Sequence, residues 1–187
     1  MTLRSHPFAA VAVVALAAIS PLGATLAQAR SAAQITQQGR DTLRLLEAQQ
    51  PRARFLARHA KAILVFPSIL KGGFIFGAET GNGVLLDHGK TAGYYNLTGG
   101  SWGLQIGGQD FSYVLFLMND AAVANLSKSE GFSAGPGTSL VMINKSAGAE
   151  ADTSMIDHDI YAFPFNGKGL MADLTLQGTK ISRIHPK

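Results

Sequence analysis

The chain has 187 residues, a formal net charge of +4 and no cysteine. The absence of cysteine excludes disulfides, thiolate metal sites, cysteine nucleophiles and lipid attachment through an N-terminal cysteine. Hydrophobic residues make up 47% of the chain and charged residues 15%, which predicts one compact domain with a real core.

The first 29 residues have the pattern of a secretory signal peptide. Arg4 precedes an uncharged apolar run at 8–19, and the small residues Ala27 and Ala29 stand at the −3 and −1 positions of a cleavage site. The run is too short to span a bilayer, which takes about 20 residues. We therefore expect cleavage after Ala29 and an exported protein, either periplasmic, peripheral at the cell envelope or secreted.

Charge is distributed unevenly along the remainder. Residues 30–71 carry eight Lys or Arg against two acids, whereas residues 72–187 carry seven against ten. We divide the mature chain, 30–187, into a basic helical segment at 30–62 and a β-rich body at 63–187. The asymmetry suggests a negatively charged surface or partner.

Two helices are predicted in the basic segment. The first covers 31–48, where Ser31 can cap a run with apolar residues at helical spacing. The second begins at Pro51, whose missing N–H costs little in a first turn, and continues toward Ile63. At 100° per residue, three of its cations fall within about 60° of arc; they are Arg54, Arg58 and Lys61. Both helices are expected to be amphipathic with a basic stripe.

From Leu64 onward, short β-branched and aromatic runs alternate with turn signals. Hairpin turns are predicted at "TGNG" (80–83) and "DHGK" (87–90), and a short helix at 119–131, capped by Asn119 or Asp120. About nine strands at intervals of roughly ten residues predict an α+β fold with a β-rich body. That body is expected to be a curved antiparallel sheet, a sandwich or a barrel-like sheet.

The stretch "KGGFIFGAETGNGVLL" (71–86) raises the question of a phosphate-binding loop. Such a loop needs a Lys-Ser/Thr after its last glycine and a helix behind it, and both are missing here. We instead expect Gly72 and Gly73 to allow a close approach or a sharp bend, and Gly81 and Gly83 to allow the hairpin.

"GGSWG" (99–103) matches the nucleophile-elbow pattern of hydrolases. The elbow requires a sharp strand-to-helix turn at the serine, but the residues that follow do not favour a helix. Ser101 is therefore expected in a strand or turn, with a serine hydrolase kept as an alternative that needs a base such as His158.

No metal or cofactor site is predicted. In "DHD" (157–159), strand alternation would send the two aspartates to one face and His158 to the other. Asp87 and His88 form the only other cluster of this kind, and we expect neither cluster to converge on a metal.

The basic segment is the strongest functional signal, and its alternative is an ordinary solvated face. Each Lys or Arg near an anionic bilayer contributes about 1 kcal/mol, so several acting together give reversible association. Nucleic acid is not an expected partner, because no aromatic stacking platform lies among the arginines.

Three stretches resemble the SYLF family of lipid-binding domains: "AKAILVFPSILKGGFIFGAETGNGVLL", "GYYNLTGGSWGLQIGGQ" and "GLMADLTLQGTKISRI". The resemblance runs from about Ala33 to the C-terminus. It implies a compact β-rich domain with helices, no catalytic activity, and lipid binding through a basic amphipathic N-terminal helix.

Carried onto this chain, the resemblance assigns lipid binding to the segment 31–61, with anionic phospholipid as the ligand class. The candidate residues are Arg40, Arg44, Arg52, Arg54, Arg58 and Lys61, and Lys71 could join them. The expected function is thus an exported, non-catalytic, membrane-binding domain without cofactors. The alternatives are the hydrolase and a structural envelope protein that binds another, unidentified protein.

Overall fold

The structure is a computed structural model that describes residues 30–73, 76–102, 109–128, 132–133, 139–143, 157–166, 169–171, 176 and 178–187. The predicted signal peptide and most of the strand predicted at 169–178 lie outside these residues. So does Gly131, the predicted end of the short helix.

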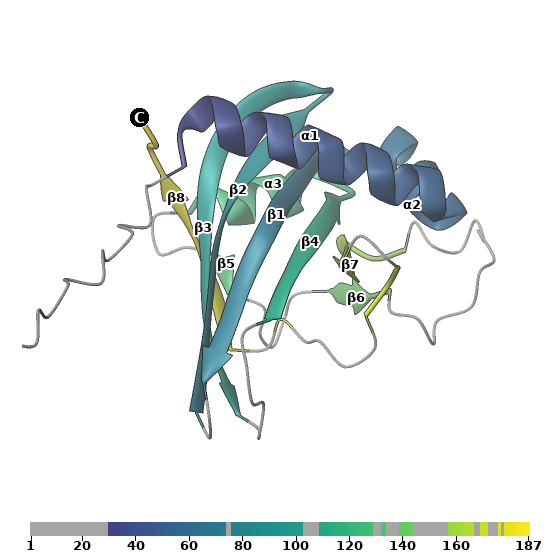
Figure 1. Ribbon diagram of the computed structural model, residues 1–187. Helices are drawn as coiled ribbons and strands as arrows, with labels where there is room; N and C mark the ends of the chain where they lie inside the picture. Colours follow the sequence, from purple (N-terminus) through teal and green to yellow (C-terminus); the bar gives the residue numbers. More distant parts are fainter. Residues whose placement is uncertain are drawn as a thin grey trace, which may run out of the picture.

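Two helices precede a sheet, and a third lies between its strands (Figure 1). The elements are α1 (Ala32–Gln49), α2 (Pro51–His59), β1 (Ala62–Gly73), β2 (Phe76–Asp87), β3 (Lys90–Trp102), β4 (Gln109–Leu117), α3 (Asp120–Leu126), β5 (Phe132–Ser133), β6 (Leu140–Met142), β7 (Ile160–Phe165) and β8 (Thr179–Ile184).

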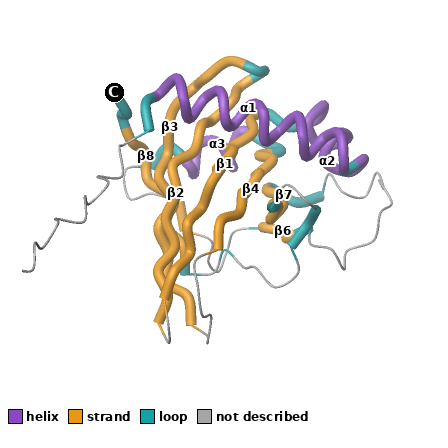
Figure 2. Tube along the Cα trace, viewed as in Figure 1, coloured by secondary structure: helices purple, strands orange, loops and turns teal. Residues whose placement is uncertain are grey.

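The strands form one curled, eight-stranded sheet in the order β5-β8-β3-β2-β1-β4-β7-β6. All pairs are antiparallel except β6 and β7, which are parallel. The α+β, β-rich prediction is confirmed. The described strands of the body all belong to one curved sheet, and the parallel pair makes that sheet mixed (Figure 2).

The predicted helix starts are confirmed. Ser31 accepts a hydrogen bond from the backbone N–H of Gln34, whose side chain in turn accepts from the N–H of Ser31, so the two form a capping box. Pro51 begins α2, and Asn119 caps α3 by accepting from the N–H of Ala122 at 2.8 Å.

The predicted extension of the second helix toward Ile63 is wrong. α2 ends at His59, and Ala60 is already extended. From Ala62 the chain pairs on both sides, opposite Asp87 in β2 and Leu117 in β4. Two ladders of backbone hydrogen bonds therefore override the helical pattern, and Lys61 leaves the predicted stripe.

One predicted hairpin turn is confirmed and the other is wrong. At 87–90, His88 and Gly89 have φ of 47° and 77° and join β2 to β3, as a two-residue turn with both central residues at positive φ requires. Residues 80–83 instead lie inside β2, where all four pair with β3 and Thr80 also pairs with Leu70 of β1.

The glycines of that stretch make room for an irregularity in β1. The pairing of β1 shifts by one residue between Val65 and Leu70, which marks a β-bulge. A Cβ on Gly81 would lie 2.5 Å from the carbonyl oxygen of Ser68, and one on Gly83 would lie 2.6 Å from that of Val65. No atom lies within 4 Å of the Cβ position of Gly72, so the close approach predicted there is not found. It occurs at Gly81 and Gly83 instead.

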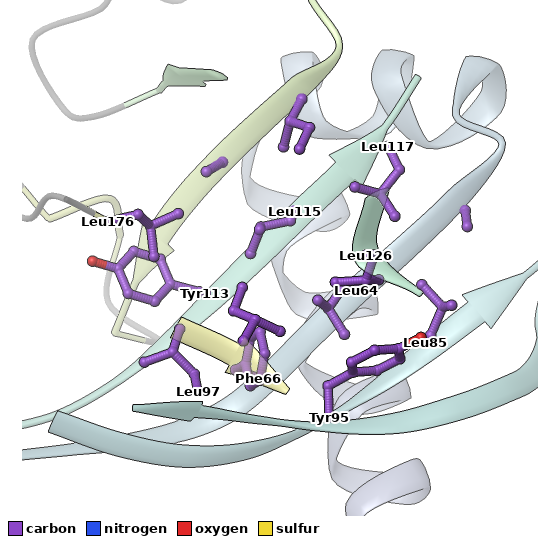
Figure 3. Close-up of a cluster of buried hydrophobic side chains, with 14 of the residues drawn as sticks. Leu64, Phe66, Leu85, Tyr95, Leu97, Tyr113, Leu115, Leu117, Leu126 and Leu176 are labelled. Carbon is purple, nitrogen blue, oxygen red and sulfur yellow. The ribbon is translucent and has the colours of Figure 1, made fainter. Parts of the chain in front are cut away.

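The two faces of the sheet bury separate apolar clusters. We call the face covered by α1 and α2 the outer face, and it packs around Val65, Val84 and Phe116. The inner face packs with α3 around Phe66 and other side chains shown in Figure 3; they include Leu64, Leu85, Tyr95, Leu97, Tyr113, Leu115, Leu117, Leu126 and Leu176.

We predict that Gly83→Ala lowers the free energy of unfolding by about 1–3 kcal/mol, because the new methyl group overlaps Phe66 and the backbone of Val65. Gly100→Ala is the matched control in the neighbouring strand, since no atom lies within 4 Å of its Cβ position. Urea denaturation measures both. Equal stability of the two variants would contradict the close approach at Gly83.

Candidate lipid-contact surface

The helices present mainly polar side chains to solvent, and Leu45 of α1 is the one exposed large apolar side chain among their described residues. The apolar side chains of Ile35 and Leu46 in α1 and of Ala53 and Leu56 in α2 are fully buried against the sheet. Thr36 also bonds to the hydroxyl of Tyr94 at 2.9 Å. A lipid surface that meets the helices in this arrangement therefore contacts their arginines and other polar groups.

Net positive charge resides on α2 and not on α1. In α1, Arg40 and Arg44 are balanced by Asp41 and Glu47, so the helix has no net charge. α2 contains three arginines and no acidic residue, a net charge of +3; the arginines are Arg52, Arg54 and Arg58. The predicted basic stripe on both helices therefore reduces to one basic helix beside a neutral one.

Arg54 is engaged with the end of α1. Its guanidinium donates to the carbonyl oxygen of Glu47 at 2.8 and 3.1 Å and to that of Ala48 at 3.4 Å. The last carbonyls of a helix lack partners within it and carry partial negative charge, so a cation stabilises them. Arg54 thus fixes the corner between α1 and α2.

Arg44 and Arg52 interact with other residues in different ways. Arg44 forms an ion pair with Asp41, one turn away on the exposed side of α1. The spacing of three residues makes this pair visible in the sequence. Arg52 is half-buried, and its charge opposes the rise that burial causes in the pKa of Tyr161.

Arg40 and Arg58 are the most available cations. Both side chains are exposed, and among the described residues neither forms an ion pair or a side-chain hydrogen bond. Arg58 lies near Glu47. Burial raises the pKa of that carboxyl, and the charges of Arg54 and Arg58 oppose the rise.

Lys61 and Lys71 do not extend this stripe. Lys61 is exposed after α2 and lies 3.8 Å from Asp120 of α3. Lys71 lies on the inner face of β1, directly opposite Glu79 in β2. The structure therefore brings Arg40, Arg44, Arg54 and Arg58 onto one helical layer and leaves Lys71 on the other side of the sheet.

Glu79 is a buried carboxylate, 4% exposed, on the inner face. A Cβ on Gly99 of β3 would lie 2.9 Å from its Oε1, so the carboxylate occupies space that the glycine leaves open. Burial raises the pKa of Glu79, and the charge of Lys71 opposes the rise. Burial, together with the charge of Glu79, also raises the pKa of Tyr113.

The candidate catalytic and metal residues lie in different elements of the structure. Ser101 lies in β3 opposite Gly77, as expected for a strand residue, and its side chain lies outside the described part. His158 bonds to Ser139 at 2.8 Å, and His88 bonds to Asp87 at 2.5 Å. Across the described ranges, no group of three or more His, Asp or Glu side chains could hold a metal.

None of the helices described here is long and apolar enough to cross a membrane.

A protein-family model matches the C-terminal half of the chain. The model of the family Ysc84, described as "Las17-binding protein actin regulator", matches residues 98–185. This range covers the end of β3 and all elements from β4 to β8, and leaves α1 and α2 outside. None of the curated proteins matches the chain.

We predict that Arg54→Ala lowers the free energy of unfolding by about 0.5–1 kcal/mol, because the final carbonyls of α1 lose their cation. Arg58→Ala removes the same charge four residues away without that hydrogen bond, and should stay within about 0.5 kcal/mol of the parent. Chemical denaturation compares them. A larger loss for Arg58→Ala would contradict the assignment.

We also predict that Glu79→Gln stabilises the protein increasingly as pH rises from about 4 to about 7. The raised pKa of Glu79 means that the parent is most stable while this carboxyl is protonated and loses stability as it ionises inside the fold. The glutamine does not ionise. Melting temperatures of both proteins across this range test the prediction, and a difference that does not change with pH would refute it.

Proposed function

The matched Ysc84 model describes the SYLF domain, so the chain is a member of the SYLF domain family, and from this premise we propose an exported, non-catalytic domain. It binds anionic lipid surfaces through the arginines of α1 and α2. The observation that carries the proposal is the exposed pair Arg40 and Arg58 on a helical layer that packs firmly on the sheet.

Electrostatics sets the expected strength of this contact. Each cation near an anionic bilayer contributes about 1 kcal/mol. Arg40, Arg44 and Arg58 point to solvent, and Asp41 reduces the contribution of Arg44. Their sum, about 2–3 kcal/mol, supports reversible and salt-sensitive association. Insertion of the apolar helix faces would instead require α1 and α2 to leave the sheet.

A sedimentation experiment with liposomes tests the proposal. The protein should bind vesicles containing anionic phospholipid at low salt, bind neutral vesicles more weakly, and lose the difference at high salt. The double variant Arg40→Gln/Arg58→Gln should bind anionic vesicles about 30-fold more weakly, from two lost cations at about 1 kcal/mol each.

Lys128→Gln is the matched control, because Lys128 is an exposed cation that follows α3, and α3 packs on the inner face of the sheet, opposite the helical layer. It should bind like the parent. Absence of binding to anionic vesicles at low salt would refute the proposal, as would equal losses for the control and the double variant.

A further inference from the structure

Arg54 bridges the corner between α1 and α2. Gln50 is the only residue between the two helices (Figure 1), and its extended backbone, with φ −124° and ψ 104°, redirects the chain there. Across this corner the guanidinium of Arg54 donates to the carbonyl oxygen of Glu47 through Nε at 3.1 Å and through Nη2 at 2.8 Å. Nη2 also donates to the carbonyl oxygen of Ala48 at 3.4 Å. A side chain of α2 thus contacts the last turn of α1 at two carbonyl groups.

The charge of Arg54 is directed toward these carbonyl groups. The last carbonyls of a helix carry partial negative charge, equivalent to about half a unit in total. Two nitrogens of Arg54 donate to them although the side chain as a whole is exposed. Arg58, one turn further along α2, is exposed and has no hydrogen bond or ion pair to the described residues. Arg58 therefore offers its full charge to a membrane, whereas Arg54 offers only part.

The hydrogen bonds of Arg54 restrain the direction of α2. The buried residues of α2 are Ala53 and Leu56. Apolar contacts such as theirs oppose separation from the sheet but have no preferred direction. Hydrogen bonds weaken steeply when bent, and a planar guanidinium that donates from two nitrogens requires a defined orientation. Arg54 therefore restrains the angle between α1 and α2 more closely than the apolar contacts do.

This angle matters because the available cations lie on different helices. Arg40 is on α1 and Arg58 is on α2. Each contributes about 1 kcal/mol near an anionic bilayer, which gives little binding by itself. When both are held in one rigid layer, contact by the first makes contact by the second intramolecular. Joint binding by the two helices then depends on the corner between them.

We infer that Arg54 is a positioning residue for lipid binding, which holds α2 in the direction in which Arg40 and Arg58 meet one membrane together. This role rests on the proposed function. It gives one of the predicted lipid-binding arginines a part that its charge alone does not explain.

Substitutions that keep the charge separate position from charge. Arg54→Lys retains the cation, but an ammonium group has no planar pair of donors with which to fix the corner. The affinity of the protein for vesicles of anionic phospholipid at low salt should fall about 5-fold, which corresponds to one cation at about 1 kcal/mol that no longer binds together with the others. Arg58→Lys is the matched control and should bind like the parent, because lysine and arginine contribute equally near a bilayer.

The salt dependence of binding is a second readout, and a loss of stability would not change it. Its steepness reflects how many cations meet the bilayer together. Arg54→Lys should show a shallower salt dependence than the parent despite an equal net charge, and Arg58→Lys the same dependence as the parent. A variant that is only less stable has fewer folded molecules, but these bind with the salt dependence of the parent. Melting temperatures establish that both variants are folded in the assay.

Three other results would overturn this role of Arg54. Affinity and salt dependence like those of the parent for Arg54→Lys would mean that Arg54 acts by charge alone, and would leave the proposed function standing. Equal losses for Arg54→Lys and Arg58→Lys would mean that each arginine makes its own contact with phosphate. Absence of binding of the parent to anionic vesicles at low salt would refute the proposed function and the positioning role together.

Discussion

α1 approaches the sheet at Gly39, where a Cβ atom would overlap the side chain of Val84, and this contact lets the helix lie directly on β1 and β2. Ile35 and Leu46 on either side of it are fully buried as a result. A larger residue at this position would lift the helix and open the outer cluster. The chemistry of the helical layer toward any partner follows from this contact, because the layer then exposes mainly polar side chains, with Leu45 as an exposed apolar one.

The arginines illustrate how one residue type serves two purposes in a small fold. Arg54 stabilises the corner between α1 and α2 through the backbone carbonyls of Glu47, and Arg52 is half-buried near Tyr161. Arg40 and Arg58 have no comparable contact among the described residues. Total charge therefore overstates the number of cations that a lipid surface can use.

Much of the fold could be predicted from the sequence where local signals decide. Ser31 and Pro51 mark helix starts through their own chemistry, and "DHGK" marks a two-residue turn. The turn predicted at "TGNG" is wrong because its glycines are needed for packing and not for a turn. Gly81 and Gly83 leave room for the bulge of the neighbouring strand β1. The need for glycine at these positions depends on which residues of β1 lie opposite them, and the sequence of β2 alone does not predict that pairing.

The candidate site was predictable to the same degree. The basic segment is visible as a charge imbalance, and the Arg44–Asp41 pair follows from helical spacing. The separation of Lys71 from the arginines depends on which face of β1 it occupies after the bulge, and a one-residue irregularity reverses that face. The role of Arg54 depends on the angle between two helices, for which the sequence has no local signal.

The central position of β1 has a further consequence. β1 pairs with β2 along one edge and with β4 along the other, and α1 covers it from the outer face at Gly39. The paired backbone amides of β1 are therefore enclosed on three sides, and their exchange with solvent hydrogen requires the sheet to open rather than a local fluctuation at an edge.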